Sequence, residues 1–492
     1  MKKTCSKCKE KKSFDFFHAN AAQKDRLHNE CKSCRALARG AVERGALPEK
    51  RATKKTILIT SAEVGVEPVR SYLKAAETFC REHDAELFIL GMREQALPLQ
   101  GQNSYYPKSI SEYICRRVLI NNNLYAEDLE LNPQQKEPLT GLQKFGNAEG
   151  RQSVIIAHSK QHLITLGSLT NPRVHATTGC ITPSFYLNHT RIGRIATLEH
   201  FHGGFIIDIL DDDTFIIQNF EFKDDGTITN YGNKYHSNGK VTKDECEAIV
   251  CGDWHVDSYK TQQNVFSSDN FRILKEQAEY FNKPQLVYHD LSSWENTSHH
   301  NRNDTRYNSK YQYQETLKLI GGFLFKSYCL SNKEVLIVKS NHDDHVGNYL
   351  KAGDFRDAGH SLEIICRHAA NYIQSGDPYS MVSDGLSDYI SPSNDFKIAG
   401  CTISLHGHKG SAGKKGSLKA IEQDVPNCVI GHSHSPSIRN YSIQVGYNGL
   451  DQEYAADAPS NWLQANCFIY KSGFKQLCIS VGGFWLPERI KL

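Results

Sequence analysis

Short apolar runs alternate with polar turns along most of the chain, and one longer amphipathic segment lies near its start. Ile57-Leu58-Ile59-Thr60 has the pattern of a buried strand, and residues 86–91 (Glu-Leu-Phe-Ile-Leu-Gly) have it again. Between them, Val66 to His83 carries apolar residues at helical spacing. A strand, a helix and a strand in this order form a βαβ unit with parallel strands. The pattern therefore predicts an α/β domain that opens at Thr56.

From about Ser153 the pattern changes to short strands separated by turns. Residues 205–209 and 215–218 are apolar, and the three aspartates at 211–213 between them predict the turn of a hairpin. His200 and His202 precede this hairpin, and we interpret them as core or surface histidines rather than ligands. This middle part of the sequence contains no constellation that predicts catalysis.

In the second half, five apolar runs are each followed directly by residues that can bind metal ions. The runs are 247–251, 285–288, 334–338, 401–405 and 427–430. The residues that follow them are, in order, Asp253 and His255, then Asp290, then Asn341 and His342, then His406 and His408, and finally His432 and His434. In layered α/β folds the carboxyl ends of the strands form the edge where ligands bind. Five such coincidences in order are not what packed core histidines would produce.

Composition and charge separate a basic head from an acidic body. The chain has 492 residues with 58 Lys+Arg and 55 Asp+Glu. Residues 1–55 hold 16 of these basic and 6 of these acidic residues, or +10, which leaves 42 and 49, or −7, for the rest. A basic head of this kind points to an anionic partner, most simply DNA, although a solvated lysine-rich terminus is the alternative.

The same composition bounds the class of protein. The length indicates two to four domains, and a hydrophobic fraction of 39% is enough to build their cores. No run approaches 18 apolar residues, so we expect no membrane-spanning helix, and the start lacks the apolar segment of a signal peptide. The 15 cysteines are an odd number spread over the chain, which favours a reducing cytoplasm over a disulfide scaffold. A homo-oligomer is compatible with the size and charge.

Two cysteine pairs in the head predict a structural zinc site. Cys5 and Cys8 form one Cys-x2-Cys pair, and Cys31 and Cys34 form the other. Four thiolates at this spacing hold one tetrahedral zinc ion, which supplies the folding energy that so short a segment lacks. We expect Phe14, Phe16 and Phe17 to pack around it. A closed site of this kind has no open coordination position, so it is not catalytic.

The second-half residues offer carboxylate, amide and imidazole groups but no thiolate, which suits manganese, iron, zinc or nickel. The ordered set Asp-x-His, Asp, Asn-His-Asp, His, Gly-His-x-His resembles the calcineurin-like metallophosphoesterase superfamily over roughly 250–450. That resemblance implies two packed sheets flanked by helices and two divalent metal ions, most simply manganese. It also implies the ligands. The first ion would take Asp253, His255, Asp290 and His434, and the second would take Asp290, Asn341, His406 and His432.

The resemblance further implies that His342 lies beside the scissile phosphate and stabilises charge or protonates the leaving oxygen. The sequence departs from the family at three positions. His289 and Ser340 replace glycines, and Ser293 replaces a histidine that some nuclease members carry. His299 and His300 are candidates for the missing donor, with an exposed loop as the alternative. His406 is preferred over His408 because it ends the strand.

A glycine- and lysine-rich loop follows His406 and could hold phosphates through Lys409, Lys414 and Lys415; a mobile solvated loop is the alternative.

The layout of the whole chain is similar to the large metallophosphoesterases of tailed phages, among them the pre-early nucleases with which T-five-like bacteriophages degrade host DNA. The sequence therefore predicts a two-metal DNA nuclease of the infected bacterial cytoplasm. The same centre would also serve a phosphatase or phosphodiesterase of small or protein phosphates, and a vestigial centre in a DNA-binding or assembly protein is a third interpretation.

We accordingly expect three parts. Residues 1–50 form the four-cysteine zinc-binding basic module, 51–245 form an α/β domain with hairpins and no assigned role, and 246–492 form the metallophosphoesterase domain.

Overall fold

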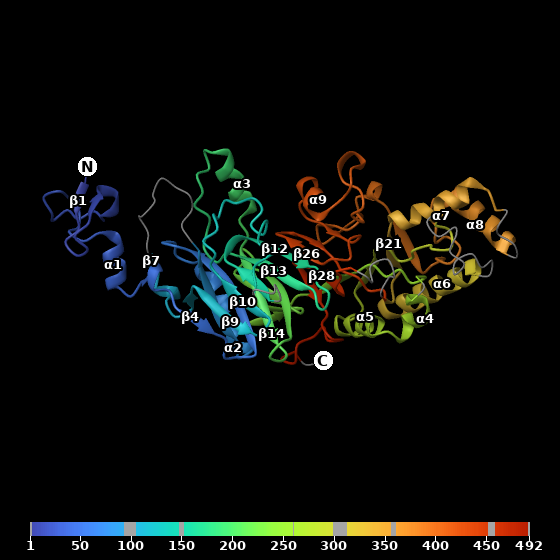
Figure 1. The fold of residues 1–492 in the computed structure, drawn as a ribbon, viewed down its shortest axis with the longest axis horizontal. Coiled ribbons are helices and arrows are strands. Elements are labelled where there is room, and N and C mark those ends of the chain that lie inside the picture. Colours follow the sequence, from blue (N-terminus) through green and yellow to red (C-terminus); the bar gives the residue numbers. More distant parts are fainter. Residues whose placement is uncertain are drawn as a thin grey trace. The chain divides into compact units, whose positions relative to one another are not determined.

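The protein has a mixed α/β fold with several sheets (Figure 1). The computed structural model describes residues 2–92, 105–146, 152–258, 260–298, 312–355, 361–450 and 458–490. These residues divide into two compact units. The first comprises Met1–His162, His175–Thr229 and Lys234–Thr242, and the second comprises Leu163–Val174, Asn230–Asn233 and Lys243–Leu492. The predicted three-part division stays a prediction.

The central sheet of the first unit has the strand order β15-β14-β5-β6-β8. β5 and β6 pair in parallel, as the βαβ pattern predicts, and β14 and β15 form the predicted antiparallel hairpin. All eight residues of β5 are buried, including the polar residues Thr60, Ser61 and Glu63, so the strand is covered on both faces. The strands are Thr56–Glu63 (β5), Glu86–Met92 (β6), Ile114–Cys115 (β8), Gly203–Ile209 (β14) and Phe215–Glu221 (β15).

Helix α2, Arg70–Glu82, connects β5 to β6 and packs on this sheet. It begins four residues after the predicted start at Val66, because a proline, here Pro68, disfavours the helical conformation in the residue before it. Tyr72 and Phe79 on its buried face belong to the same core as Leu58 of β5. The apolar face of the helix was thus predicted, whereas its first turn and the extension of β5 to Glu63 were not.

The other elements of the first unit are short. Its second sheet contains β13, β11, β10, β9 and β4 in this order, with β4 parallel to β9. β4 includes Lys50, so the end of the predicted zinc module lies in a sheet strand. The bounds are Lys2–Thr4 (β1), Lys11–Ser13 (β2), Lys32–Ala38 (α1), Val42–Glu43 (β3), Glu49–Arg51 (β4), Tyr105–Tyr106 (β7), Arg117–Asn121 (β9), Leu124–Glu127 (β10), Ser153–Ile156 (β11), His158–Leu166 (β12), Arg173–Gly179 (β13), Arg191–Glu199 (α3), Thr227–Asn230 (β16), Asn233–His236 (β17) and Val241–Lys243 (β18).

The second unit is built on a six-stranded sheet with the order β22-β21-β20-β19-β28-β29. β19, β20, β21 and β22 are mutually parallel, and β28 and β29 complete the sheet in antiparallel orientation. Three of the five predicted strands therefore lie side by side with their carboxyl ends at one edge. The bounds are Cys246–Cys251 (β19), Gln285–Tyr288 (β20), Val335–Val338 (β21), Ser387–Ile390 (β22), Ala465–Tyr470 (β28) and Lys475–Ile479 (β29).

Helices cover this sheet. In Figure 1, α7 and α8 pack together on one side of β21, and α5 and α6 lie together on the other. One hydrophobic core joins them to the strands, with Trp254, Trp294 and Phe323 among its largest buried side chains. The helices are Thr261–Asn264 (α4), Asp269–Tyr280 (α5), Gln312–Ser331 (α6), Asn341–Ala352 (α7), Leu362–Ser375 (α8) and Leu418–Asp424 (α9).

The last two predicted strands are shorter than expected and lie outside the six-stranded sheet. The run 401–405 yields only Cys401–Thr402 (β24), paired with Lys397–Ile398 (β23), and 427–430 yields Val429–Ile430 (β25). β25 pairs in parallel with Ser442–Gln444 (β27), which pairs with Ser437–Arg439 (β26). The chain leaves strand geometry before His406, whose carbonyl accepts a hydrogen bond from the Gly431 backbone N–H.

Candidate functional site

The carboxyl edge of the six-stranded sheet gathers the predicted ligands of the first three runs. Asp253 follows β19, Asp290 follows β20, and Asn341 is the first residue of α7 after β21. The backbone N–H groups of Trp254 and His255 both donate to the Asp290 carbonyl, over 3.1 and 2.9 Å. Because β19 and β20 are parallel neighbours, the loops that follow them lie side by side, and these two bonds connect them.

Four buried side chains at this edge form the first candidate metal set: Asp253, His255, Asp290 and His434. One ligand atom from each lies within 4.8 Å of the others. The Nε2 atoms of His255 and His434 are 3.0 Å apart, and His434 Nε2 is 3.3 Å from Asp253 Oδ2. Two imidazole nitrogens that face each other this closely need a shared proton or a cation between them.

A second candidate set consists of Asp290, His406 and His432. His406 Nε2 lies 3.0 Å from Asp290 Oδ2. Asp290 belongs to both sets, so its carboxylate is the element that they share. The structure groups His406 with Asp290 and leaves His408 outside the set, with their ring centroids 5.4 Å apart.

The donor atoms of these residues fit divalent cations. Asp253 Oδ1, Asp290 Oδ1 and Asn341 Oδ1 are buried, and none of them has a hydrogen-bond partner among the described residues. A buried oxygen without a donor is costly, and a cation is a partner that carboxylate and amide oxygens accept. Asn341 begins α7 at the same edge, so its oxygen is available to join the second set.

Metal binding requires ionised carboxylates and neutral imidazoles. The two carboxylates and His255 meet this requirement, whereas Asp290 overcomes burial and raises the pKa of His406, so a metal ion would have to displace a proton from this ring. Burial alone would raise the pKa of Asp290, but His406 and His342 outweigh burial and lower it well below the usual range. Burial opposes ionisation of Asp253 too, and the hydrogen bond from His434 still lowers its pKa. Burial lowers the pKa of His255 to about 3, which keeps this ring neutral.

The backbone at the site is held in an uncommon conformation. Four of the predicted ligands have left-handed φ angles: His255 at 47°, Asp290 at 38°, His432 at 79° and His434 at 59°. Residues other than glycine adopt this region at a cost, and they do so most often at functional sites. The surrounding packing must therefore compensate for the strain at these positions.

Close packing at Gly431 shows how tightly the site is built. A Cβ atom at this position would lie 2.4 Å from Asp253 Oδ1 and 2.7 Å from His289 Cβ. The next residue, His432, donates its backbone N–H to Asp253 Oδ2 over 2.8 Å. Gly431 therefore lets the segment of His432 and His434 approach the first loop closely enough to reach both metal sets.

His342 lies beside the first set without belonging to it. Its ring centroid is 4.8 Å from that of His255, and its Nδ1 lies 3.2 Å from the Ser293 carbonyl. Ser293 Oγ also shares a 2.8 Å hydrogen bond with His255 Nδ1, and the Ser293 N–H donates to Asp257 over 2.6 Å. Ser293 thus orients both imidazoles through their Nδ1 atoms and leaves both Nε2 atoms for other partners.

Asp343 anchors the helix that carries Asn341 and His342. Its carboxylate accepts hydrogen bonds from the Ser340 N–H, Tyr379 OH and Tyr389 OH over 2.9, 2.7 and 3.2 Å, and from Trp294 Nε1 over 3.3 Å. Ser340 and Asp343 form a capping box at the start of α7. The convergence of two tyrosines and a tryptophan on Asp343 has no local pattern in the sequence.

The three lysines predicted to bind DNA lie in the exposed loop after His406. Lys409 and Lys415 form an antiparallel bridge, which closes the loop, and Gly410 and Lys414 pair through the backbone over 2.7 Å. The Lys409 ammonium lies 3.3 Å from Asp344. Lys409, Lys414 and Lys415 are all exposed.

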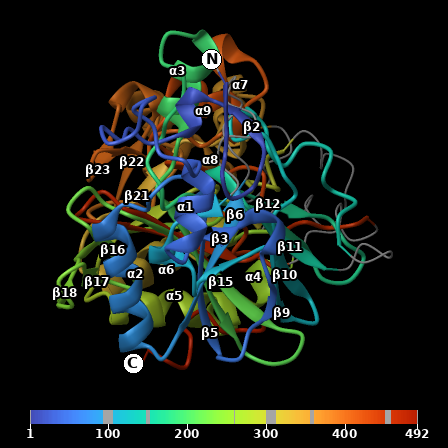
Figure 2. The same ribbon diagram turned by 90° about the vertical axis from the view of Figure 1, so that its left-hand side faces the viewer.

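The four predicted zinc ligands come together in the N-terminal module, the dark blue segment of Figure 2. Cys5, Cys8, Cys31 and Cys34 place their Sγ atoms within 4.8 Å of one another. Cys5 Sγ and Cys34 Sγ are 3.9 Å apart, close to the ~3.8 Å that tetrahedral geometry and Zn–S bonds of about 2.3 Å require.

The thiolate character of Cys5 supports a metal at this cluster. Burial would raise the pKa of Cys5, but backbone N–H groups, that of Cys31 first, lower it to about 6. Phe17 is buried against the cysteines, and Phe16 and Leu27 are packed beside it. The expectation for Phe14 was wrong: it begins the short helix Phe14–Phe16 (η1), and of this helix only Phe16 packs against the cluster.

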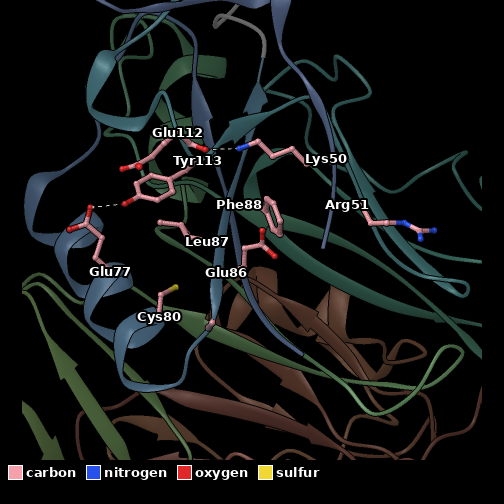
Figure 3. A pocket seen from close by; sticks show the side chains of 10 residues that line it. Lys50, Arg51, Glu77, Cys80, Glu86, Leu87, Phe88, Glu112 and Tyr113 are labelled. Atoms are coloured by element: carbon pink, nitrogen blue, oxygen red, sulfur yellow. Dashed lines mark hydrogen bonds between the residues drawn. The ribbon is translucent and has the colours of Figure 1, made fainter. Parts of the chain in front are cut away.

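The hollow drawn in Figure 3 is separate from the predicted metal ligands. It lies in the first unit, has a volume of about 570 Å³, and is lined by Lys50, Glu77 and Tyr113 among others. Two hydrogen bonds engage polar groups of its lining. The Tyr113 OH donates to Glu77 over 3.2 Å, and Lys50 donates to the Glu112 carbonyl over 2.6 Å. It adds no chemistry to the site.

His299 and His300 lie outside the described residues.

Comparison with known proteins finds a phage relative. The chain is 23% identical to Protein A1 of Escherichia phage T5 over 464 residues, which covers 86% of this chain and 81% of that protein. The protein is therefore related to a bacteriophage protein. No protein-family profile matches the chain, and no solved structure matches it. Among the described helices, none is both long and apolar enough to span a lipid bilayer.

Removal of the shared carboxylate should empty both candidate sets. We expect Asp290→Asn to lose bound manganese entirely while its thermal unfolding stays close to wild type, because one charge serves both sets. Metal content is measured by mass spectrometry after dialysis, with Asp344→Asn as the control because Asp344 lies outside both sets. Two tightly held ions in Asp290→Asn would contradict the shared role.

The cysteine cluster should hold one zinc ion per chain. We expect Cys31→Ser to lose this ion, because three thiolates leave the tetrahedral site open. Cys329→Ser, which changes an exposed cysteine of α6, should keep it. The same metal analysis decides the outcome, and an unchanged zinc content in Cys31→Ser would show that the cluster is not a zinc site.

Proposed function

We propose that this protein is a two-metal-dependent phosphodiester hydrolase of the calcineurin-like metallophosphoesterase superfamily, and that its substrate is DNA. The observation that carries the proposal is the buried carboxylate of Asp290, which belongs to two adjacent Asp/His sets. Paired divalent ions with a shared ligand are the arrangement that clamps both the attacking and the leaving oxygen of a phosphoryl displacement.

Seven residues would hold the two ions. Carboxylate, amide and imidazole ligands without a thiolate suit manganese, iron, zinc or nickel, and among these manganese is the ion that we propose. When bound, the ions would supply an activated water molecule and stabilise charge on the phosphoryl oxygens. The ligands are Asp253, His255, Asp290 and His434 for one ion and Asp290, Asn341, His406 and His432 for the other.

His342 would act on the substrate rather than on a metal ion. Its Nδ1 faces the Ser293 carbonyl, an acceptor, so Nδ1 carries a proton and Nε2 is left to face the substrate. A protonated Nε2 can hydrogen-bond a phosphate oxygen or give its proton to the leaving oxygen. Ser293 and Asp343 would hold this ring and Asn341 in place from opposite sides of the first turn of α7.

DNA as the substrate is supported by charge. Residues 1–55 carry a net charge of +10, from 16 basic and 6 acidic residues, and Lys414 and Lys415 add exposed cations near the site. The relation to a protein of phage T5 favours action in the cytoplasm of an infected bacterium. All 15 cysteines are free, which fits that reducing compartment.

The deciding experiment incubates the purified protein with manganese and three substrates. These are linear duplex DNA, circular duplex DNA and a generic phosphomonoester. We expect cleavage of DNA and little hydrolysis of the monoester, and the comparison of the two DNA forms shows whether free ends are required. Preferential hydrolysis of the monoester would favour a phosphatase, and no hydrolysis of any substrate would favour a vestigial centre.

Substitution of His342 should separate catalysis from metal binding. We expect His342→Ala to lower the rate by roughly 10²–10⁴-fold, the usual contribution of such a group, while it keeps both ions. His432→Ala and His434→Ala should instead lose metal, because each contributes a ligand to one set. Turnover and metal content of all three variants are measured together. If His342→Ala loses metal or keeps full activity, the assignment of its role is wrong.

Deletion of residues 2–40 should impair binding of DNA but not hydrolysis of a small diester. This deletion removes the cysteine cluster and leaves in place β3, which pairs with β7, and β4, which pairs with β9. The zinc site is closed and contributes no catalytic group. We expect a weaker affinity for DNA, a smaller salt dependence and an unchanged rate on the diester. A lost diester activity in a folded deletion variant would contradict this division.

A further inference from the structure

A polar hollow lies in the N-terminal module, here defined as residues 2–40. It has a volume of about 480 Å³, and apart from Ala38 its lining is polar or charged. The residues used below are Asn20, Gln23, His28, Glu30, Arg35 and Arg39. No phenylalanine, tyrosine or tryptophan is among the described residues that line it, and its one ring, the imidazole of His28, is hydrogen-bonded by Arg35.

Arg35 presents a guanidinium group that forms no ion pair with a carboxylate among the described residues. One of its terminal nitrogens, NH1, donates a hydrogen bond to His28 Nδ1 over 2.5 Å. The Arg35 Nε atom is buried and has no acceptor among the described residues. Burying an N–H group without an acceptor costs free energy. An anion bound in the hollow would attract the guanidinium group and remove that cost.

Arg39 is the second cation of the hollow, and in the described part of the chain neither it nor Arg35 forms an ion pair with a carboxylate. The electrostatic field of this module is positive. Burial lowers the pKa of the nearby His18, and the charges of Lys32 and Arg35 lower it further. Glu30 is the single carboxylate in the lining and opposes this field.

We propose that this hollow binds a backbone phosphate of nucleic acid, with Arg35 and Arg39 as its ligands. Guanidinium groups recognise phosphate oxygens through paired N–H donors, and the Gln23 amide adds another donor. Because the lining is dominated by donors and positive charge and holds no phenylalanine, tyrosine or tryptophan, the contact reads the backbone and not the base sequence. The choice of nucleic acid as the source of the phosphate rests on the proposed function.

The test measures binding of a short fluorescent duplex, and of one of its strands alone, by anisotropy at several salt concentrations. The full-length protein carries Asp290→Asn so that DNA is not cut, and zinc content is measured for each variant. Arg39→Gln is the main variant because this residue is exposed and its loss leaves the packing intact. Arg26→Gln is the matched control, since Arg26 is an exposed arginine of the same module that does not line the hollow.

We expect Arg39→Gln and Arg35→Gln to weaken binding roughly 10-fold. The slope of log affinity against log salt should fall by about 0.9 on the duplex and about 0.7 on the single strand, the values for one lost phosphate contact. The affinity of Arg26→Gln for the duplex should stay within about twofold of that of the parent protein, and the slope of its salt dependence should be unchanged. Glu30→Gln should tighten binding, because it removes the opposing charge.

Equal effects of Arg39→Gln and Arg26→Gln would overturn the proposal, because they would show general attraction without a site. Inorganic phosphate is also added at millimolar concentration. If it displaces the duplex from the parent protein but not from Arg39→Gln, the hollow is a site for a free anion, and the proposal is overturned. Hydrolysis of a small diester by otherwise unsubstituted protein and by its Arg39→Gln variant is measured separately. A protein that binds as expected but hydrolyses nothing would refute the proposed function and leave this inference standing.

Discussion

The structure of the second unit depends on the burial of two carboxylates that lie close together. Asp253 and Asp290 are almost completely inaccessible to solvent, and each has an oxygen without a donor in the described chain. Burial and mutual repulsion both oppose ionisation of such a pair, and only the imidazoles around it keep the pKa of both groups low. A site of this kind is stable only when positive charge is supplied, which is why histidines from three separate segments converge on it.

The same constraint explains the strained backbone. The polypeptide must bring an imidazole into contact with a buried carboxylate immediately after a strand, within two or three residues. Left-handed φ angles at His255 and Asp290 turn the chain sharply enough to do this, and Gly431 permits the close approach of the next segment. Hydrogen bonds from Trp254 and His255 to the Asp290 carbonyl then fix the turn. The arrangement of these side chains therefore depends on strained backbone conformations at His255 and Asp290.

The sequence predicted the parts of the fold that depend on local pattern. Parallel pairing of β5 with β6 and the hairpin of β14 and β15 followed from apolar runs and turn residues. The convergence of Asp253, Asp290 and Asn341 followed because the strands before them are parallel. The short lengths of β24 and β25 did not follow, since contacts of His406 and Gly431 across the site end these strands. Ser293 and Asp343 were missed as positioning residues because their partners lie far away in the sequence.

One short segment serves both candidate metal sets. His432 belongs to one set and His434 to the other, with a single residue between them. A change in the backbone that improves the position of one imidazole necessarily displaces the other. The two candidate sets are therefore coupled through one short stretch of backbone, and a protein that kept one set without the other would need a different geometry over His432 and His434.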